Sequence, residues 1–508
     1  MFELFGIGIP VTIVMVFGGL LLGILVGATP GLAGPMAMAV SLPILISVFG
    51  YNPDALLPVM GFLIGIMKGS TIGGAVPAIL FNTPGTPDAY MTTLDGYPMT
   101  TKGQSGKALR VAHFSSVSGD TFSDLVLFTC APFLAILVES YLDFPEKTAL
   151  IILSLSFIAA IVGNSVAKGL ISMSLGMLIA YIGTGEDFYP RLTGDIESIS
   201  SGFPIVSVIL GVLIIGEVFK GIEELWLDKY PRTKPQNAVN STSNKLTLSD
   251  IIIILPYIRN SAIIGTIIGA LPGIGSTLAA TLGYATGKKL YQNRKHADDP
   301  KFGEGAIQGI ASTEAANSAV SGSNLIPVLS LGIPGNAAAV FLILATETIG
   351  GFNPGPSVFR FTVEEINPEL VIAFGLFTIM LFANFLNWTI GGAFMRAMGI
   401  MTRAPKQYIL PIVLLLSLTA IYSQETDINA IWYTLGFGVL GYLFRKTGIS
   451  PLPFVIAYML AGKLESGARQ AFDSTGGDPW FLFNSPTSIG LLALSVFVIF
   501  FFAKSSKN

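Results

Sequence analysis

The sequence predicts an all-α polytopic membrane protein made of two inverted-topology repeats, each with a re-entrant helical hairpin and a discontinuous helix. Three observations lead to this prediction: an apolar composition, two pairs of similar motifs, and an uneven distribution of basic residues between corresponding loops. Of the 508 residues, 52% are hydrophobic and only 12% are charged, and the mean hydropathy is +0.69. One soluble core cannot hide so much apolar surface, whereas several uncharged windows approach the ~20 residues that a membrane-spanning helix needs.

The clearest candidates for membrane-spanning helices are apolar segments distributed along the whole chain. They are Ile9 to Ala28, Leu125 to Val138, Ala149 to Val166, Leu170 to Ile182, Phe203 to Ile215, Leu370 to Trp388, Ile409 to Ser423, Ile428 to Phe444 and Ser488 to Ala503. The shorter ones are expected to extend into their flanks. Met1 to Ala28 has no basic start and no small-residue cleavage site, which indicates an uncleaved membrane segment rather than a signal peptide.

Two pairs of motifs divide the chain into similar halves. "GATPGLAG", from Gly27, resembles "GALPGIGS", from Gly269, at an offset of 242 residues. "VPAILFNTPGTPDA", from Val76, resembles "IPVLSLGIPGNAAA", from Ile326, at an offset of 250 residues. Because the order of the motifs is kept, we interpret residues 1–222 and 250–508 as two membrane repeats. Residues 223–249 then form a polar cytoplasmic linker.

Basic residues indicate that the two halves have opposite orientations. After the first motif, the loop Ser47 to Ala55 has no Lys or Arg, whereas its counterpart, Gly287 to Glu304, has five. After the second motif the bias reverses. Gly96 to Arg110 is basic, whereas Gly350 to Asn367 contains Arg360 as its only basic residue. Basic loops tend to face the cytoplasm, so corresponding loops are predicted on opposite sides, as in an inverted repeat.

The motifs themselves predict breaks in the helices. Pro272 and Gly273 divide Asn260 to Gly287 into pieces of about 12 and 14 residues, too short to cross the bilayer, and both flanks are basic, so a re-entrant hairpin fits best. The second motif lies between loops of opposite bias and fits a discontinuous spanning helix. Backbone polar groups freed by proline and glycine are tolerated at membrane depth only where they are packed in protein or line a polar cavity.

Paired breaks near the membrane midplane therefore predict a binding site for an anion and a cation. The candidate substrate- or ion-binding residues lie at the breaks or carry neutral hydrogen-bonding groups nearby. They are Pro30, Gly31, Ser70, Thr71, Asn82, Thr83, Pro84, Gly85 and Thr86 in the first half, and Pro272, Gly273, Ser276, Thr277, Glu314, Asn317, Ser318, Asn324, Pro334, Gly335 and Asn336 in the second. For a single Ser or Thr, close helix packing is the alternative explanation.

Two charged residues interrupt apolar segments. Lys68 could pair with a substrate carboxylate or extend to the membrane interface. Glu314 could carry a proton, complete a cation site or hydrogen-bond a neighbouring helix. His113 and His296 have no partners at ligand spacing, so no metal site is predicted beyond a transported Na⁺. Asp88 and Asp95 are expected to belong to a polar loop rather than to take part in chemistry.

Absent motifs restrict the function classes. The chain has no G-x-x-x-x-G-K-[ST] loop for ATP, and it has no G-x-S-x-G or H-E-x-x-H motif that would indicate a membrane enzyme. A channel would need a continuous polar stripe, whereas polarity here is concentrated at the breaks. The sequence therefore favours a transporter driven by an ion gradient, without an enzymatic activity.

The motif series resembles the large membrane subunit of the tripartite tricarboxylate transporters, the TctA family. The resemblance rests on "GATPGLAG", "AILFNTPGTPDA", "LDGYPMTTKGQSGKAL", "GALPGIGSTLA", "EAANSAVSGSNLIPVLSLGIPGNAA" and "GFNPGPSVF", which cover nearly the whole chain in the family's order. His113, Asp120 and Gly287 depart from the family pattern, and these departures bear on the substrate more than on the fold.

The resemblance implies a permease of the bacterial inner membrane that imports citrate-like di- or tricarboxylates by symport with Na⁺ or H⁺ and binds no other cofactor. Its implied partners are a small TctB-like membrane subunit and a periplasmic TctC-like solute-binding protein; no nucleic-acid partner is expected. The implied mechanism is alternating access, with the broken segments moving against a scaffold of longer helices. The alternatives are a transporter of another small organic anion that needs no binding protein, a channel, or a membrane enzyme.

Overall fold

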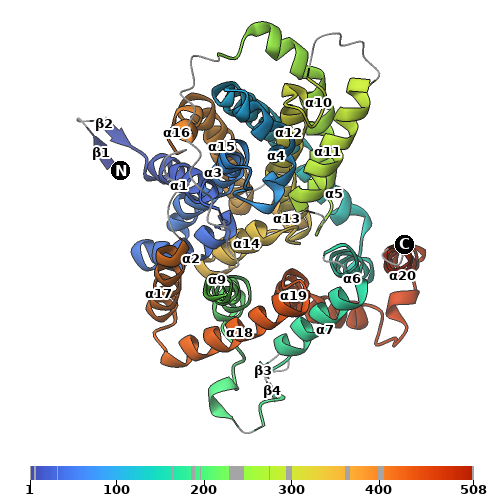
Figure 1. Ribbon diagram of the computed structural model, residues 1–508. Coiled ribbons are helices and arrows are strands. Elements are labelled where there is room, and N and C mark those ends of the chain that lie inside the picture. Colours follow the sequence, from blue (N-terminus) through green and yellow to red (C-terminus); the bar gives the residue numbers. More distant parts are fainter. Residues whose placement is uncertain are drawn as a thin grey trace.

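The computed structural model is helical almost throughout (Figure 1). It describes residues 2–4, 7–30, 32–162, 165–184, 189–194, 196–227, 245–273, 275–292, 300–360, 367–398 and 406–505. In this part of the chain the strands form only two short antiparallel pairs, β1 (Phe2–Leu4) with β2 (Ile7–Ile9) and β3 (Gly183–Thr184) with β4 (Pro190–Arg191). Seven of the described helical segments are long and apolar enough to cross a membrane. The predicted all-α, multi-pass architecture is confirmed.

The seven spans agree only partly with the predicted segments. They are Pro53–Phe81, Ser105–Tyr141, Phe144–Ile161, Ile205–Trp226, Leu248–Gly269, Pro368–Ala397 and Pro486–Lys504. The prediction omits Pro53–Phe81 and Leu248–Gly269, because Lys68 in the first and Arg259 in the second interrupt their apolar runs.

The first helical hairpin packs on a long helix through a row of glycines. It consists of α1 (Val11–Gly27) and α2 (Gly34–Phe49), and a short 3₁₀ turn, η1 (Pro53–Ala55), leads from α2 into α3 (Leu56–Phe81). A Cβ atom at Gly19 would lie 2.1 Å from the Phe62 carbonyl oxygen, and one at Gly27 would lie 2.2 Å from that of Ser70. Residue numbers rise together along this contact, so α1 and α3 run parallel, and α2 returns to the start of α3.

The second hairpin has the same arrangement. It consists of α10 (Leu248–Gly269) and α11 (Gly275–Gln292), which pack on α12 (Ile307–Ser323). A Cβ atom at Gly265 would lie 2.2 Å from the Ala316 carbonyl oxygen, and Gly269 faces Val320 further along, so α10 and α12 are parallel. Gly283 faces Ala316 and Gly287 faces Ser312, so α11 runs antiparallel to α12.

The same backbone hydrogen bond occurs at the tip of each hairpin. At the end of α1, Ala28 N–H donates to the Ile24 carbonyl at 2.9 Å, and at the end of α10, Ala270 N–H donates to that of Thr266 at 3.1 Å. These donors and acceptors correspond at the offset of the first motif pair. The sequence similarity therefore marks a repeated local structure.

The two predicted helix breaks also share their backbone geometry. After α3, the chain passes through Asn82–Thr86 and a 3₁₀ turn, η2 (Pro87–Ala89), into α4 (Tyr90–Thr101); α12 continues through α13 (Leu325–Leu331) and the break Gly332–Asn336 into α14 (Ala337–Ile349). Asn82, with φ of 53°, and Gly332, with φ of 71°, both end a helix in the left-handed conformation. The next N–H group returns in each case to a proline carbonyl six residues earlier, Thr83 to Pro77 and Ile333 to Pro327. Such bonds satisfy carbonyls that a helix end would otherwise leave unpaired.

The helices form two groups, each drawn from both halves of the sequence (Figure 1). The hairpin group contains α1–α4, α5 (Ser105–Tyr141), α10–α14, the 3₁₀ turn η5 (Pro356–Phe359), and α15 (Pro368–Leu386) with its π-helical extension Asn387–Gly391 and α16 (Gly392–Ala397). The peripheral group, in the lower part of the view, contains α6 (Phe144–Ile161), α7 (Val166–Ala180), η3 (Glu197–Ile199), α8 (Ile205–Leu210), the π-helix Gly211–Ile215, α9 (Gly216–Trp226), α17 (Lys406–Glu425), α18 (Ile428–Thr447), α19 (Leu452–Ser474), η8 (Phe481–Phe483) and α20 (Pro486–Ser505). The two sequence halves are therefore interleaved in space.

Helices occupy both ends of the predicted linker, because α9 continues to Trp226 and α10 begins at Leu248. Residues 228–244 lie outside the described part. The division into repeats at 222 and 250 stays a prediction.

Candidate functional site

At the first break, the predicted residues Asn82, Thr83 and Pro84 mainly shape the backbone. Asn82 is exposed, and its left-handed conformation ends α3. The hydroxyl of Thr83 donates to the Phe81 carbonyl at 3.2 Å, and Pro84 is half-buried.

The rest of the first break is buried against the tip of the first hairpin. Gly85 N–H donates to the Gly74 carbonyl at 3.2 Å, and a Cβ atom on Gly85 would lie 2.2 Å from the Gly27 carbonyl oxygen. Thr86 is 7% exposed, and its hydroxyl has no hydrogen-bond partner among the described residues. Only glycine at position 85 allows this close approach of two backbone segments.

The hairpin tips contribute backbone groups more than side chains. Pro30 is half-buried, and Gly31 lies outside the described residues. In the second tip, Pro272 is half-buried, and Gly273 N–H donates to the Gly335 carbonyl at 2.8 Å. In each half, therefore, the hairpin tip touches the helix break.

The predicted hydroxyl residues near the tips do not form one cluster. Ser70 and Thr71 donate to the Met67 carbonyl of their own helix, at 3.0 and 3.1 Å. Ser276 is half-buried, whereas Thr277 is exposed. A hydroxyl bonded to its own helix is common in membrane helices and does not itself indicate a ligand.

At the second break, Pro334 and Gly335 are buried and Asn336 is half-buried. The Asn336 side-chain oxygen accepts a hydrogen bond from Ala339 N–H at 2.9 Å, which makes Asn336 the N-cap of α14. This bond explains an asparagine at the start of a helix.

The strongest indication of a polar ligand site is on α12. The predicted residues Asn317, Ser318 and Asn324 are at most 2% exposed. Both polar atoms of each asparagine side chain and the Ser318 hydroxyl oxygen have no hydrogen-bond partner among the described residues. Buried polar atoms are rarely left unpaired, because the lost hydrogen bonds with water are not replaced. These three side chains could therefore bind water, an ion or a polar substrate.

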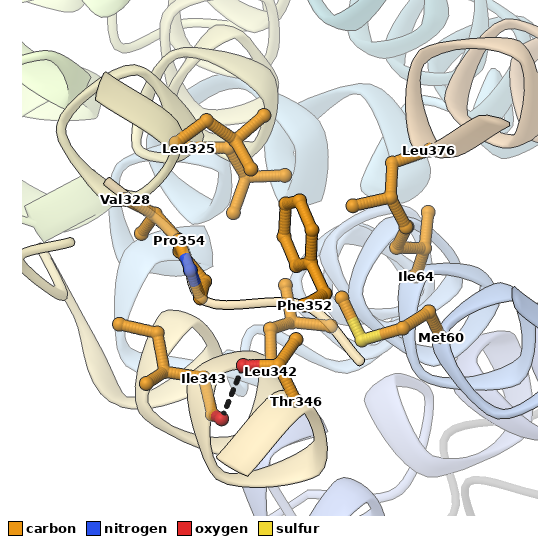
Figure 2. A pocket seen from close by; sticks show the side chains of 11 residues that line it. Met60, Ile64, Leu325, Val328, Leu342, Ile343, Thr346, Phe352, Pro354 and Leu376 are labelled. Atoms are coloured by element: carbon orange, nitrogen blue, oxygen red, sulfur yellow. Dashed lines mark hydrogen bonds between the residues drawn. The ribbon is translucent and has the colours of Figure 1, made fainter. Parts of the chain in front are cut away.

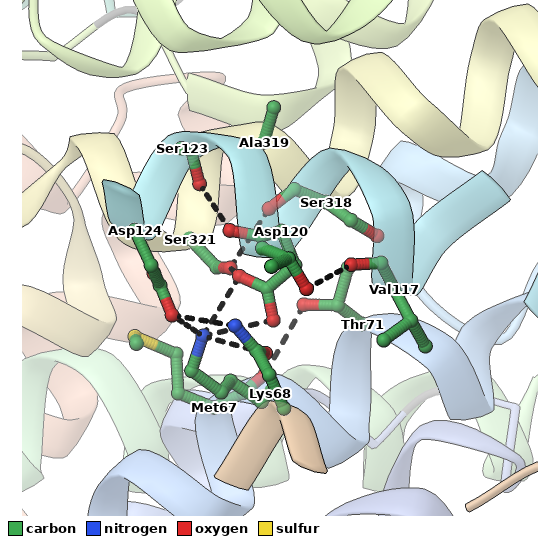
Figure 3. A network of polar contacts seen from close by, with 12 residues as sticks. Met67, Lys68, Thr71, Val117, Asp120, Ser123, Asp124, Ser318, Ala319 and Ser321 are labelled. Atoms are coloured by element: carbon green, nitrogen blue, oxygen red, sulfur yellow. Dashed lines mark hydrogen bonds and ion pairs between the residues drawn. The ribbon is translucent and has the colours of Figure 1, made fainter. Parts of the chain in front are cut away.

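A buried charged cluster lies between α3, α5, α12 and α15 (Figure 3). The Lys68 ammonium lies 2.9 Å from both carboxylate oxygens of Asp120, 2.7 Å from Oδ2 of Asp124 and 3.2 Å from Oδ1 of Asn384. Ser321 of α12 donates to Asp120. Lys68 is 1% exposed and paired inside the protein, so neither suggested role, contact with a substrate carboxylate or extension to the interface, is seen.

Sequence reasoning missed Asp124 and Asn384 and noted Asp120 only as a departure from the family. A signal was present, because Asp120 and Asp124 are four residues apart and so lie on one face of a helix. Two carboxylates on one apolar helix need a buried cation, and Lys68 on another apolar helix could have been matched to them.

Glu314 is fully buried and joins α12 to two other helices. One carboxylate oxygen accepts from Thr92 of α4, and the other accepts from Ser116 of α5 at 2.8 Å. Of the three suggested roles, the structure displays the hydrogen bond to neighbouring helices.

Asp95 holds α4 against the start of α12. It is 0% exposed, and its Oδ1 accepts from the N–H groups of Gly303, Gly305 and Ala306 at 2.8–2.9 Å, while Tyr284 donates to Oδ2 at 3.0 Å. Asp95 lies within helix α4, so its predicted place in a polar loop is wrong. Its bonds are all internal and hold residues 303–306 against this helix. No group of three His, Cys, Asp or Glu residues placed to hold a metal ion occurs in the described part of the chain.

Two cavities lie beside the second break. Figure 2 shows a small apolar one of about 10 Å³ between α3, α13, α14 and α15, lined by residues such as Met60, Leu325 and Phe352. This volume admits about one water molecule, and the lining offers little to a carboxylate.

The second cavity is larger, about 220 Å³, and lies between the hairpin group and the peripheral group. Its lining comes from the end of α5, the first turns of α6, Leu331 and Ile333 of the second break, η5 and α19. It contains Lys147 and Lys463 together with Thr148, Ser466 and Gln470, and no acidic side chain. Sequence reasoning missed this cavity, because its lysines lie far from the break in sequence.

Comparison with known proteins identifies the family. The model of the tripartite tricarboxylate transporter TctA family matches residues 13–456. This chain belongs to the TctA family. The resemblance found in the motifs is therefore confirmed, and the TctA family is a family of transporters that work in tripartite systems.

Two relatives come from Agrobacterium vitis. One, described as "Uncharacterized 52.8 kDa protein in TAR-I ttuC' 3'region", is 30% identical over 96% of this chain and 92% of its own length. The other, described as "Uncharacterized protein in TAR-II ttuC' 3'region", is 28% identical over 46% of this chain and 90% of its own length. No solved structure matches this TctA-family chain.

Proposed function

We propose that this TctA-family chain is the permease subunit of a secondary transporter that imports di- or tricarboxylates, such as citrate, with Na⁺ or H⁺. Family membership supports transport of this substrate class. The observation that carries the proposal for this chain is the 220 Å³ cavity at the second break, which contains two lysines and no acidic side chain.

The cavity suits a small polyanion. The Lys463 ammonium forms no hydrogen bond, and no ion pair within 4 Å, with a described residue, although Glu347 lies close enough to interact electrostatically. It lies near the left-handed turn at Gly332, where an added Cβ atom would be 3.2 Å from Nζ. Lys147 is partly neutralised by Glu139, at 3.0 Å. Lys463 is therefore the stronger candidate for a substrate carboxylate.

We propose that the two repeats have inverted topology and that both hairpins are re-entrant. The contacts between loops support this orientation. Lys102 donates to the Glu304 carbonyl at 2.6 Å, which joins the two basic loops. A Cβ atom on Gly351 would lie 3.1 Å from Pro53, which joins the two loops poor in basic residues. Loops that correspond in sequence are thus not the ones in contact, as an inverted repeat requires.

For alternating access, we propose that the hairpin group moves relative to the peripheral group. The cavity supports this idea, since its lining comes from both groups and a relative movement would open it to one side of the membrane or the other. The two groups also meet at the tip of the second hairpin, where a Cβ atom added on Gly273 would lie 3.0 Å from the Cα atom of Ile158 in α6.

The partners we propose are a TctB-like small membrane subunit and a TctC-like periplasmic solute-binding protein, in a bacterial inner membrane. The tripartite family supports the presence of further subunits. The peripheral group also exposes large apolar side chains, among them Trp432, Phe497 and Phe500, which suit lipid or a membrane partner.

The test is uptake of labelled citrate into proteoliposomes that contain this chain, the small subunit and the binding protein, under an inward cation gradient. Saturable uptake that needs the binding protein, together with citrate counterflow, is expected. A channel would show no saturable counterflow, and an enzyme would alter the citrate. Failure of uptake and counterflow for citrate and for a panel of other di- and tricarboxylates would contradict the proposal.

A further inference from the structure

The coupling ion can be inferred from the buried charged cluster of Lys68, Asp120, Asp124 and Asn384. Four oxygen atoms surround the Lys68 ammonium, three from the two carboxylates and one from the Asn384 amide, at 2.7–3.2 Å. Carboxylate and amide oxygens are also the ligands that hard cations prefer. The ammonium therefore occupies the place that a bound Na⁺ would need.

The charges of this cluster do not balance. Two ionised carboxylates and one ammonium leave one negative charge, in a place where the side chains of Lys68, Asp120 and Asp124 are at most 3% exposed. An unbalanced charge inside a membrane protein is costly. One added proton would make the cluster neutral.

One oxygen atom is free to receive that proton. Oδ2 of Asp124 accepts from Lys68 and from Asn384 Nδ2, each at 2.7 Å, and both oxygens of Asp120 accept from Lys68. Oδ1 of Asp124 is buried without a hydrogen-bond partner among the described residues. It faces Gly322 of α12, where an added Cβ atom would be 2.2 Å away.

In the part of the chain that the structure describes, no other charged group on the packed helices supplies the balance. On α15 the charged residue is Glu369, in the first turn, and on α16 Arg396 is exposed. On α4, Asp95 is bound by Tyr284 and backbone N–H groups. On α12, the nearest carboxylate is Glu314, which is bound by Thr92 and Ser116. Helix α13 contains no charged residue. On α10, Asp250 pairs with Lys107 and Arg259 is exposed.

We infer that Asp124 is the coupling site, that the coupled ion is a proton, and that Lys68 takes the place of Na⁺ as a tethered cation. This inference rests on the proposed transport function. Protonation of Asp124 would change the charge beside α12, whose Ser321 donates to Asp120. The same helix carries Asn317 and is followed directly by Asn324, whose polar side-chain atoms, like those of Asn317, have no hydrogen-bond partner among the described residues; the chain then leads through α13 into the second break. Proton binding and substrate binding would thus act on one helix.

The experiment uses proteoliposomes with the complete transporter and a pH-sensitive dye inside. A pH gradient without Na⁺ should drive citrate accumulation, and citrate addition should acidify the lumen, whereas a Na⁺ gradient at equal pH should have no effect. Asp124→Asn keeps the shape and cannot take the proton. In this variant, pH-driven citrate accumulation should fall at least about tenfold, while citrate counterflow is retained. The matched control, Asp473→Asn at the exposed end of α19, should behave as the wild type.

A second variant tests the role of Lys68. Lys68→Ala combined with Asp124→Asn removes one charge of each sign and leaves the oxygen shell of Asp120 open, so Na⁺ should now stimulate counterflow.

Three outcomes would overturn the inference. Na⁺-driven uptake by the wild type without proton entry would contradict it, and so would normal pH-driven accumulation by Asp124→Asn. Counterflow that couples to neither ion would do the same while leaving the proposed function intact. Absence of counterflow with every carboxylate would remove the proposed function and this inference together.

Discussion

The breaks at Asn82–Thr86 and Gly332–Asn336 have an equivalent backbone, but their surroundings differ. Both begin with a left-handed residue and a bond back to a proline carbonyl. Each also touches the tip of its own hairpin, at Gly27 and at Gly273. In the helix before the first break, the charged residue Lys68 is enclosed in an ion-pair cluster. The second break adjoins a 220 Å³ cavity in which Lys463 forms no hydrogen bond or ion pair with a described residue, although Glu347 lies close enough to interact electrostatically.

This difference teaches that similar motifs preserve a backbone design while the surroundings of each break take a separate task. In our account, the helix before the first break, α3, forms the charged cluster for the coupling ion together with α5 and α15. The second break borders the opening at which the substrate binds, and helices from both halves line this opening. Four changes, ordered by expected size, test this division.

The largest effect is expected from Lys68→Met. This change leaves two carboxylates in a buried site without a cation, and removing one partner of a buried ion pair costs about 3–5 kcal/mol. Unfolding of the purified protein in mixed micelles measures the loss. The exposed Lys504→Met is the control and should change nothing. A loss below about 1 kcal/mol would mean that the cluster is not as closed as the contacts indicate.

Gly332→Ala should cost about 2–3 kcal/mol, since an alanine there is strained at positive φ and its Cβ atom would lie 2.4 Å from the Pro354 carbonyl oxygen. Asn82→Ala, at the equivalent and exposed position, should cost only about 1 kcal/mol. Thermal unfolding of the two variants compares the breaks directly. Equal losses would refute the difference in packing.

Lys463→Gln should weaken citrate binding about tenfold, which corresponds to about 1.4 kcal/mol. Lys147→Gln should weaken it less, about threefold, because Glu139 already neutralises part of this charge. The concentration dependence of counterflow measures both. A larger effect at Lys147 than at Lys463 would reverse our assignment of the two lysines.

The smallest difference concerns the last residue of each break. Asn336→Ala removes an N-cap and should cost about 1 kcal/mol. Thr86→Val, at the corresponding position, removes a hydroxyl that has no partner among the described residues and should change stability by less than about 0.5 kcal/mol. Denaturant titration of both variants checks this contrast, and a loss at Thr86 as large as at Asn336 would reveal an unseen partner.

The sequence predicts the helical class and both breaks, because hydropathy marks apolar helices and the effect of proline and glycine on the backbone depends only on neighbouring residues. Pro77 and Pro327 mark the same turn in the two halves, and the similar motifs give this correspondence directly. The interleaving of the halves could not be predicted, because it depends on which helix faces pack. The glycine contacts of Gly19 and Gly27 with α3 are visible only in three dimensions.

For the candidate site, one local rule gives residues with different surroundings. It predicts Asn317, Ser318 and Asn324 as polar groups near a break; they are buried, and their polar side-chain atoms have no hydrogen-bond partner among the described residues. It also predicts Asn336, which is a helix cap. Binding of substrate or ion by any of them stays a prediction. Lys463 could not be found, because Lys463 of α19 and Gly332 meet only in the folded chain and are more than a hundred residues apart in sequence.

The most direct test of the account is whether substrate occupies the cavity at the second break. Cys130 is the only cysteine, so a Cys130→Ser background allows a single reporter, Ser466→Cys, in the cavity lining. Ser474→Cys, exposed at the end of the same helix, is the matched control. We predict that citrate slows labelling of Ser466→Cys by a small thiol reagent and leaves the control unchanged. Equal labelling of Ser466→Cys with and without saturating citrate, in a preparation that performs citrate counterflow, would contradict the account.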